Sequence, residues 1–141
     1  MDLKKTLISI YKEAKEQFGL QKAPKLYLRD DVENSKNIFG RTAYYAPDSE
    51  VVVLYITGRH PKDICRSFAH ELVHHHQNER GDLEMGDASS PTYAQDDKHM
   101  RKMEMEAYLK GNMLFRDWEA WYKNYIKKSD PIQMIGPQLL S

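Results

Sequence analysis

Hydrophobic residues recur at helical spacing near the start of the chain and over a long stretch near its end. The first series has a period of three to four residues and comprises Leu3, Leu7, Tyr11, Ala14 and Phe18. Gly19 follows this series, and a glycine just after the last periodic residue is typical of a helix end. The pattern therefore predicts one helix over residues 2–18 and a second, longer helix over about residues 96–128.

Between these two helices, the pattern of apolar residues is that of strands. Leu26, Leu28 and Val32 alternate with polar residues, and a turn is expected at residues 34–37. A further strand is expected over residues 38–45. The run that begins at Val51 and ends at Ile56 is rich in β-branched residues, and turn-forming residues precede it. We expect a hairpin over residues 38–56.

The middle of the chain predicts a third long helix. Pro61 suits the first helical position, and Gly81 marks the end of a helix over residues 61–79. Residues 81–95 have no periodicity and are expected to form a loop, and residues 129–141 an irregular tail. The chain is thus expected to be one α+β domain over residues 1–141. In it, a small antiparallel or mixed sheet of about three strands packs on the N-terminal helix, the middle helix and the long C-terminal helix.

Composition narrows the classes of function. The 141 residues include 21 Lys and Arg and 21 Asp and Glu, so the net charge is zero and no basic stripe favours nucleic-acid binding. The single cysteine, Cys65, excludes a disulfide within the chain, and a cytoplasmic location is the expectation. No apolar run is long enough to cross a membrane, and the apolar stretch near the N-terminus is too short for a secretion signal. We therefore expect neither a nucleic-acid nor a membrane partner.

The middle helix carries the motif H-E-x-x-H, formed by His70, Glu71 and His74. Two histidines four residues apart lie one turn apart on the same helix face, so both imidazoles can reach one metal ion. Zinc accepts neutral imidazole nitrogens in a tetrahedral shell. The intervening glutamate is turned by about 100° and can act as general base on the attacking water. We interpret the motif as a catalytic site for one Zn²⁺ ion.

Two further histidines follow the motif directly. His75 and His76 do not share the helix face of His70. Because metal ligands must converge on one ion, we interpret His75 as a buried core residue and His76 as partly exposed.

A catalytic zinc site usually has a third protein ligand, and the long C-terminal helix offers candidates. On a helical wheel, Glu104 falls within the apolar stripe and Glu106 outside it. A carboxylate in a core stripe needs a cation, which a zinc ion or a buried basic residue would supply. Glu104 is the preferred third ligand, with Glu106 and His99 as alternatives.

HELVH followed about thirty residues later by the helical sequence Glu104-Met105-Glu106-Ala107 resembles the gluzincin metallopeptidases, and in particular their compact ImmA/IrrE-like and minigluzincin groups. The resemblance covers roughly residues 50–108. It implies that Glu104, three residues before Ala107, is the third zinc ligand. It also implies that the strand over residues 51–56 is an edge strand that pairs with an extended peptide or protein substrate.

The chain departs from that pattern at Tyr108, where many relatives carry an Asp or Asn that orients a zinc-bound histidine. The oxyanion of the transition state needs a donor, for which Tyr93, His99, Arg101 and Tyr108 are eligible. Tyr108, one turn from Glu104, is preferred.

The function expected from these residues is zinc-dependent hydrolysis of peptide bonds, by an endopeptidase rather than an exopeptidase. Three alternatives stay open. The first is a binding or assembly module with a closed or vestigial zinc site. The second is a latent peptidase, blocked by the loop over residues 81–95 or by the tail. The third is an SprT-like peptidase, in which His99 would be the third ligand.

Overall fold

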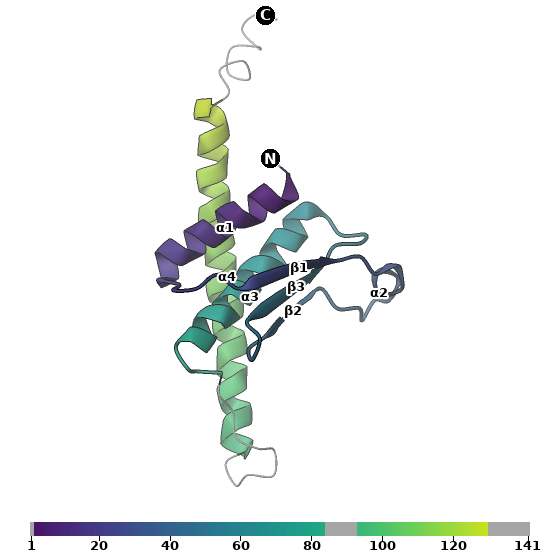
Figure 1. Ribbon diagram of the computed structural model, residues 1–141, viewed down its shortest axis with the longest axis vertical. Helices are drawn as coiled ribbons and strands as arrows, with labels where there is room; N and C mark the ends of the chain where they lie inside the picture. Colours follow the sequence, from purple (N-terminus) through teal and green to yellow (C-terminus); the bar gives the residue numbers. More distant parts are fainter. Residues whose placement is uncertain (1, 84–92, 130–141) are drawn as a thin grey trace, which may run out of the picture.

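The computed structural model describes residues 2–83 and 93–129, and over these residues the chain is an α+β domain, as expected (Figure 1). The elements, in chain order, are α1 Leu3–Phe18, β1 Lys25–Arg29, α2 Val32–Lys36, β2 Ala43–Ala46, β3 Val51–Tyr55, α3 Pro61–Glu79 and α4 Tyr93–Ser129. The expected tail over residues 129–141 lies outside the described residues except for Ser129. Most of the expected loop over residues 81–95 lies outside them too.

The three strands form a mixed sheet in the order β1-β3-β2. β1 runs parallel to β3, with Lys25 opposite Val51, and β2 runs antiparallel to β3, with Ala46 opposite Val51. The predicted hairpin is confirmed for β2 and β3. The prediction that residues 51–56 form an edge strand is wrong, because β3 is hydrogen-bonded on both sides and has no free edge for a substrate. Its nearly continuous run of buried residues is typical of a central strand.

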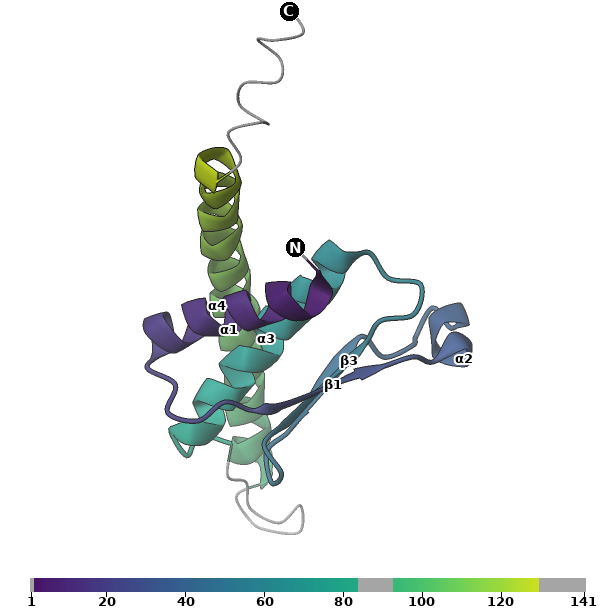
Figure 2. The ribbon, with the colours of Figure 1, turned by 45° about the horizontal axis from the view of Figure 1, so that its top comes forward.

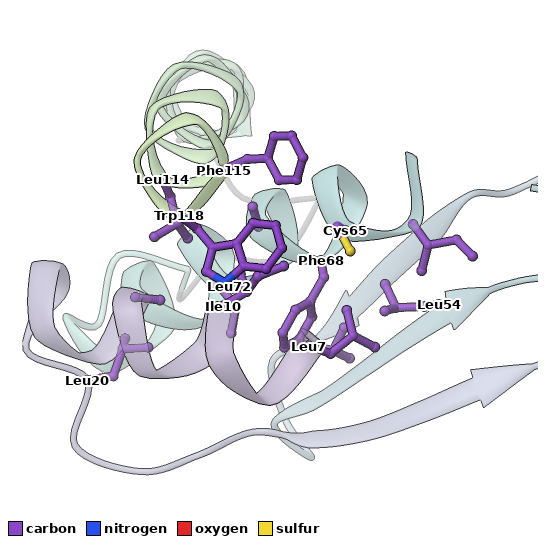
Figure 3. Packing of buried hydrophobic residues seen from close by; sticks show 14 residues of the cluster. Leu7, Ile10, Leu20, Leu54, Cys65, Phe68, Leu72, Leu114, Phe115 and Trp118 are labelled. Carbon is purple, nitrogen blue, oxygen red and sulfur yellow. The ribbon is translucent and has the colours of Figure 1, made fainter. Parts of the chain in front are cut away.

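α3 is the central element of the fold and contacts α1, α4, β2 and β3 (Figures 1 and 2). The α1, α3 and α4 helices and the inner face of the sheet enclose one hydrophobic core (Figure 3). Leu7 and Ile10 of α1 meet Leu72 of α3 and Leu114 of α4 there, and all four side chains have no exposed surface. Burying such a side chain contributes about 1.5–3 kcal/mol. The core therefore fixes α3 and α4 against each other.

The ends of α1 follow from local hydrogen bonding. The carboxylate of Asp2 accepts a hydrogen bond from the Lys5 amide and caps the N-terminus. Gly19 adopts a left-handed conformation (φ 67°), in which its amide donates to the carbonyl of Lys15. The predicted end of this helix at Phe18 is confirmed.

Two details between β1 and β2 differ from the sequence prediction. Residues 32–36 form a short helix, α2. Asp31 caps the N-terminus of this helix by accepting a hydrogen bond from the Asn34 amide. The strand expected over residues 38–45 begins only at Ala43, and Ile38 and Phe39 are 90% and 87% exposed. Their apolar character suggested a strand, but they lie in a loop before β2.

In the described part of the chain, no helix is both long enough and apolar enough to cross a membrane.

Candidate metal centre

The H-E-x-x-H motif lies in the middle of α3, where the sequence placed it. Pro61 occupies the first turn, and the His60 side chain caps the helix by accepting a hydrogen bond from the Lys62 amide. The rings of His70 and His74 project from one face, with centroids 5.0 Å apart. The donor atoms of His70, Glu71 and His74 all lie within 4.8 Å of one another.

Glu104 reaches this pair of histidines from α4. Its Oε1 atom lies 2.7 Å from Nε2 of His70 and 3.1 Å from Nε2 of His74, so one carboxylate oxygen meets both imidazoles. The placement of Glu104 at the site agrees with the expectation, but the reasoning from burial was wrong. Its side chain is 50% exposed, because α4 faces an open cleft at this turn rather than the core.

Gln77, which the sequence analysis overlooked, fixes the orientation of His74. Its side-chain amide donates to the carbonyl of Met103 (2.9 Å) and to Oε1 of Glu106 (2.8 Å). The amide nitrogen therefore points away from His74, and Oε1 of Gln77 accepts a hydrogen bond from Nδ1–H of His74 (2.8 Å). Gln77 has no exposed surface. Its burial and its partners on α4 are set by the tertiary fold, so no pattern in the sequence singles it out.

This tautomer has a consequence at the centre of the site. With the proton on Nδ1, a neutral His74 presents its Nε2 lone pair to Oε1 of Glu104 at 3.1 Å. Two acceptors at this distance repel each other unless a proton or a metal cation lies between them. The geometry therefore requires a proton or a metal cation at the point where His70, His74 and Glu104 converge.

Glu71 lies beside this point but is buried, with 6% of its surface exposed. Burial is the main cause that raises its pKa, to about 7; the charge of Glu104 adds to the rise and His74 opposes it. Burial also lowers the pKa of His70, although the hydrogen bond to Glu104 opposes this shift. For Glu104, burial would raise the pKa, but His74 and His70 outweigh it and the pKa is lowered. These shifts favour the neutral form of His70 and the charged form of Glu104. Metal ligation requires both of these forms.

A cleft of about 640 Å³ opens over the two histidines, between β2, α3 and α4. Tyr108 lines it, and its ring packs edge-on against His70 with centroids 4.6 Å apart. The preferred oxyanion donor therefore lies at the site. Thr42 and the first three residues of β2, residues 43–45, also line the cleft.

Gly111 sets how closely α4 approaches α3 at the metal centre. A Cβ atom at this position would lie 3.0 Å from Cα and 3.1 Å from the amide nitrogen of His70. Contacts this short with backbone atoms are rare, so a side chain at residue 111 would force the helices apart. The absence of a side chain lets the turn that bears Glu104 lie over the histidines.

The other candidate ligands are engaged elsewhere. Glu106 pairs with Arg80 (2.8 Å) and Lys110 (3.0 Å). Nε2 of His99 hydrogen-bonds to the carbonyl of Asp82 (2.6 Å). Neither Glu106 nor His99 lines the cleft. Of the remaining oxyanion candidates, Arg101 is an exposed partner of Asp97, and the side chain of Tyr93 is outside the described part.

The adjacent histidines behave as predicted. His75 is fully buried; its Nε2–H donates to the carbonyl of Lys22 (2.6 Å) and its Nδ1 accepts from the hydroxyl of Tyr45 (2.8 Å). His76 is partly exposed and stacks on Phe18 with centroids 5.1 Å apart.

The donor set fits zinc. Two imidazole nitrogens and one carboxylate oxygen form the three-ligand set of many catalytic zinc sites, which keep a fourth position open. Neighbouring ligand atoms in a tetrahedral zinc site lie about 3.3 Å apart. The contacts of Glu104 are slightly shorter, as expected where the carboxylate touches the imidazoles directly.

Comparison of the chain with protein-family models, with curated proteins and with solved structures finds no match. The case for a function therefore rests on the residues and geometry of the chain itself.

Proposed function

We propose that the chain is a zinc-dependent metallopeptidase of the gluzincin type, which hydrolyses peptide bonds in a peptide or protein substrate. The observation that carries the proposal is the convergence of His70, His74 and Glu104 on one point, where the facing acceptor atoms need a proton or a metal cation between them. Glu71 lies beside that point on the same helix as the histidines.

In the proposed reaction, His70, His74 and Glu104 would hold the ion. Zinc, when bound, lowers the pKa of water and polarises a carbonyl group. The carboxylate of Glu71 takes a proton from the attacking water and passes it to the nitrogen of the leaving amine. The hydroxyl of Tyr108 is the proposed donor to the carbonyl oxygen as negative charge develops on it. Gln77 keeps the proton of His74 on Nδ1 and leaves Nε2 free for the ion.

The substrate is proposed to lie along β2 rather than β3. Hydrogen-bonded and free residue pairs alternate in an antiparallel ladder. The Tyr55 amide donates to the carbonyl of Thr42, so the polar backbone groups of Ala43 and Tyr45 point away from β3. Both residues line the cleft, and free backbone groups at a sheet edge pair readily with an extended peptide.

The rival functions have less support. A closed structural zinc site needs a fourth protein ligand, and the nitrogens of His75 and His99 are hydrogen-bonded elsewhere. An SprT-like site would need His99 at the metal, but His99 binds Asp82. The latent form rests on the loop over residues 81–95 and the tail over residues 129–141, most of which lie outside the described part of the chain.

The test measures zinc and hydrolysis in the same preparations. The wild type should bind about one zinc ion per chain and cleave unfolded protein substrates. Glu71→Gln should keep the zinc and lose hydrolysis, because only the proton carrier is removed, and Glu104→Ala should lose both. Glu119→Ala is the matched control, because it removes a carboxylate of α4 that pairs with Lys62 outside the cleft, and it should keep the zinc. Undiminished hydrolysis by Glu71→Gln would refute the mechanism, and a wild type that binds no zinc would refute the proposed centre.

A further inference from the structure

The two ends of the cleft differ in chemistry. At one end lie Thr42, Arg66 and Ser67, together with Asn112 of α4. Arg59 joins this end, because its guanidinium donates to the carbonyl of Thr42 (2.9 Å) and to the hydroxyl of Ser67 (2.8 Å). The side chains at this end are polar or charged.

The opposite end of the cleft is apolar and is lined by Pro47, Leu83 and Met100. Asn78, near the C-terminal end of α3, donates to the carbonyl of Pro47 (3.0 Å) and so places this end beyond the motif. The metal centre lies between the two ends. A substrate that crosses the centre therefore meets different side chains on the two sides of the bond to be cleaved.

Arg66 gives the polar end a positive charge. Its side chain is 50% exposed, and its guanidinium lies over the ring of Phe115, 5.3 Å from the centroid. Its ion-pair partner, Asp63, is 3.4 Å away, so most of its five N–H donors remain available. Among the described residues that line the cleft, Glu71 and Glu104 are the only acidic ones, and both belong to the metal centre.

The direction of β2 decides which side of a substrate meets Arg66. β2 runs from the end at Thr42 toward the end at Pro47. A peptide that adds to its free edge in antiparallel fashion runs the opposite way. Its residues on the carboxyl side of the cleaved bond then lie beside Arg66.

On the basis of the proposed function, we propose that the cleft selects substrates with a carboxylate on the carboxyl side of the cleaved bond, bound by Arg66. The carboxylate is an Asp or Glu side chain or the C-terminal carboxylate of the substrate. A guanidinium binds either group through paired N–H donors, and the aromatic ring beneath it limits the conformations it loses on binding. Arg66 acts here as a specificity residue and takes no part in bond cleavage.

Binding is measured first, with the zinc-loaded Glu71→Gln protein, so that the peptides stay intact. Three fluorescent peptides share one neutral sequence: one amidated, one amidated with a single Glu near its carboxyl end, and one with a free C-terminal carboxylate. Fluorescence anisotropy should show about five- to tenfold tighter binding of at least one carboxylate peptide than of the neutral amide. A larger gain in affinity for the Glu peptide indicates a side-chain carboxylate, and a larger gain for the free acid indicates the C-terminal carboxylate.

Substitutions in the same Glu71→Gln background assign the effect to Arg66. Arg66→Ala should remove the preference, and Arg66→Glu should favour a Lys-containing amide instead. Arg29→Ala, an equal change of charge on β1 outside the cleft, is the control and should keep the preference. Equal binding of all three peptides, or a preference that persists in Arg66→Ala, would overturn the inference.

Cleavage by the wild-type protein separates this inference from the proposed function. Its products from a peptide library, mapped by mass spectrometry, should carry an excess of acidic residues or chain ends just after the cut, and Arg66→Ala should lose that excess. Cleavage without the excess would overturn the inference and leave the peptidase standing. Arg66-dependent binding without any cleavage would refute the peptidase and leave the carboxylate site standing.

Discussion

The substitution Gln77→Leu tests whether the metal centre depends on a residue that would not touch the metal. Leucine has a similar volume but no polar atoms. The change leaves Nδ1–H of His74 without its partner, whereas the carbonyl of Met103 loses one donor but keeps its hydrogen bond within α4. Glu106 keeps Arg80 and Lys110, so its loss is small.

The expected magnitudes follow from these contacts. A buried polar group left without a partner costs about 1–3 kcal/mol, so the free energy of unfolding of the metal-free protein should fall by about that amount. Loss of an orienting partner of a metal-bound histidine typically lowers metal affinity about 10- to 100-fold. Without Gln77, the proton of His74 is free to move to Nε2, where it competes directly with zinc.

Three measurements separate the role in stability from the role at the metal. Urea unfolding of the metal-free protein gives the stability, competition with a chromophoric chelator gives the zinc affinity, and ¹⁵N NMR of the histidines gives the tautomer of His74. Ile10→Ala, in the core and distant in sequence from the motif, should destabilise the protein by at least as much, about 2–5 kcal/mol. It should leave the zinc affinity of the folded protein unchanged. If Gln77→Leu loses stability but keeps the Nδ1–H tautomer and wild-type zinc affinity, the assigned role is refuted.

Three further predictions concern packing and burial. Gly111→Ala should lower both stability and zinc affinity, since its Cβ meets the backbone of His70; a higher melting temperature with unchanged zinc binding would contradict this. Tyr45→Phe should cost about 1–3 kcal/mol in urea unfolding, because it leaves Nδ1 of His75 without its donor, whereas Tyr44→Phe should cost much less. Burial raises the pKa of Cys65 from near 9 to about 11, so a thiol reagent at pH 8 should react only as the protein unfolds. Because the pKa of Cys65 is higher in the folded than in the unfolded protein, the contribution of the thiol to stability should be lost as the pH rises from about 9 to 11. Rapid labelling of Cys65 in the native protein would refute its assignment as a buried thiol.

The sequence predicted those parts of the fold and the site that depend on local pattern. The bounds of α3, the hairpin and the common helix face of His70 and His74 follow from periodicity and turn residues. What it missed depends on tertiary neighbours. The central position of β3 requires the parallel pairing with β1, and no spacing along the chain encodes that pairing.

Glu104 is the instructive case. The wheel assigned it to a buried stripe, yet its surroundings are a cleft, and its partners come from a helix 30 residues earlier. The wheel identified the correct side of α4 but carried no information on what α4 faces there. Gln77 was overlooked for the same reason, because its value lies in Met103 and Glu106 on another helix.

The close crossing of α3 and α4 at Gly111 also bears on how the sequence can vary. A side chain at residue 111 would meet the backbone of His70, so this position limits how closely the two helices can approach at the metal centre. Core residues away from the crossing can exchange for others of similar volume without changing where Glu104 meets the histidines. Tolerance to substitution should therefore differ along α4. Leu114 can be replaced by another apolar residue of similar volume, whereas no substitute for Gly111 keeps the helices equally close.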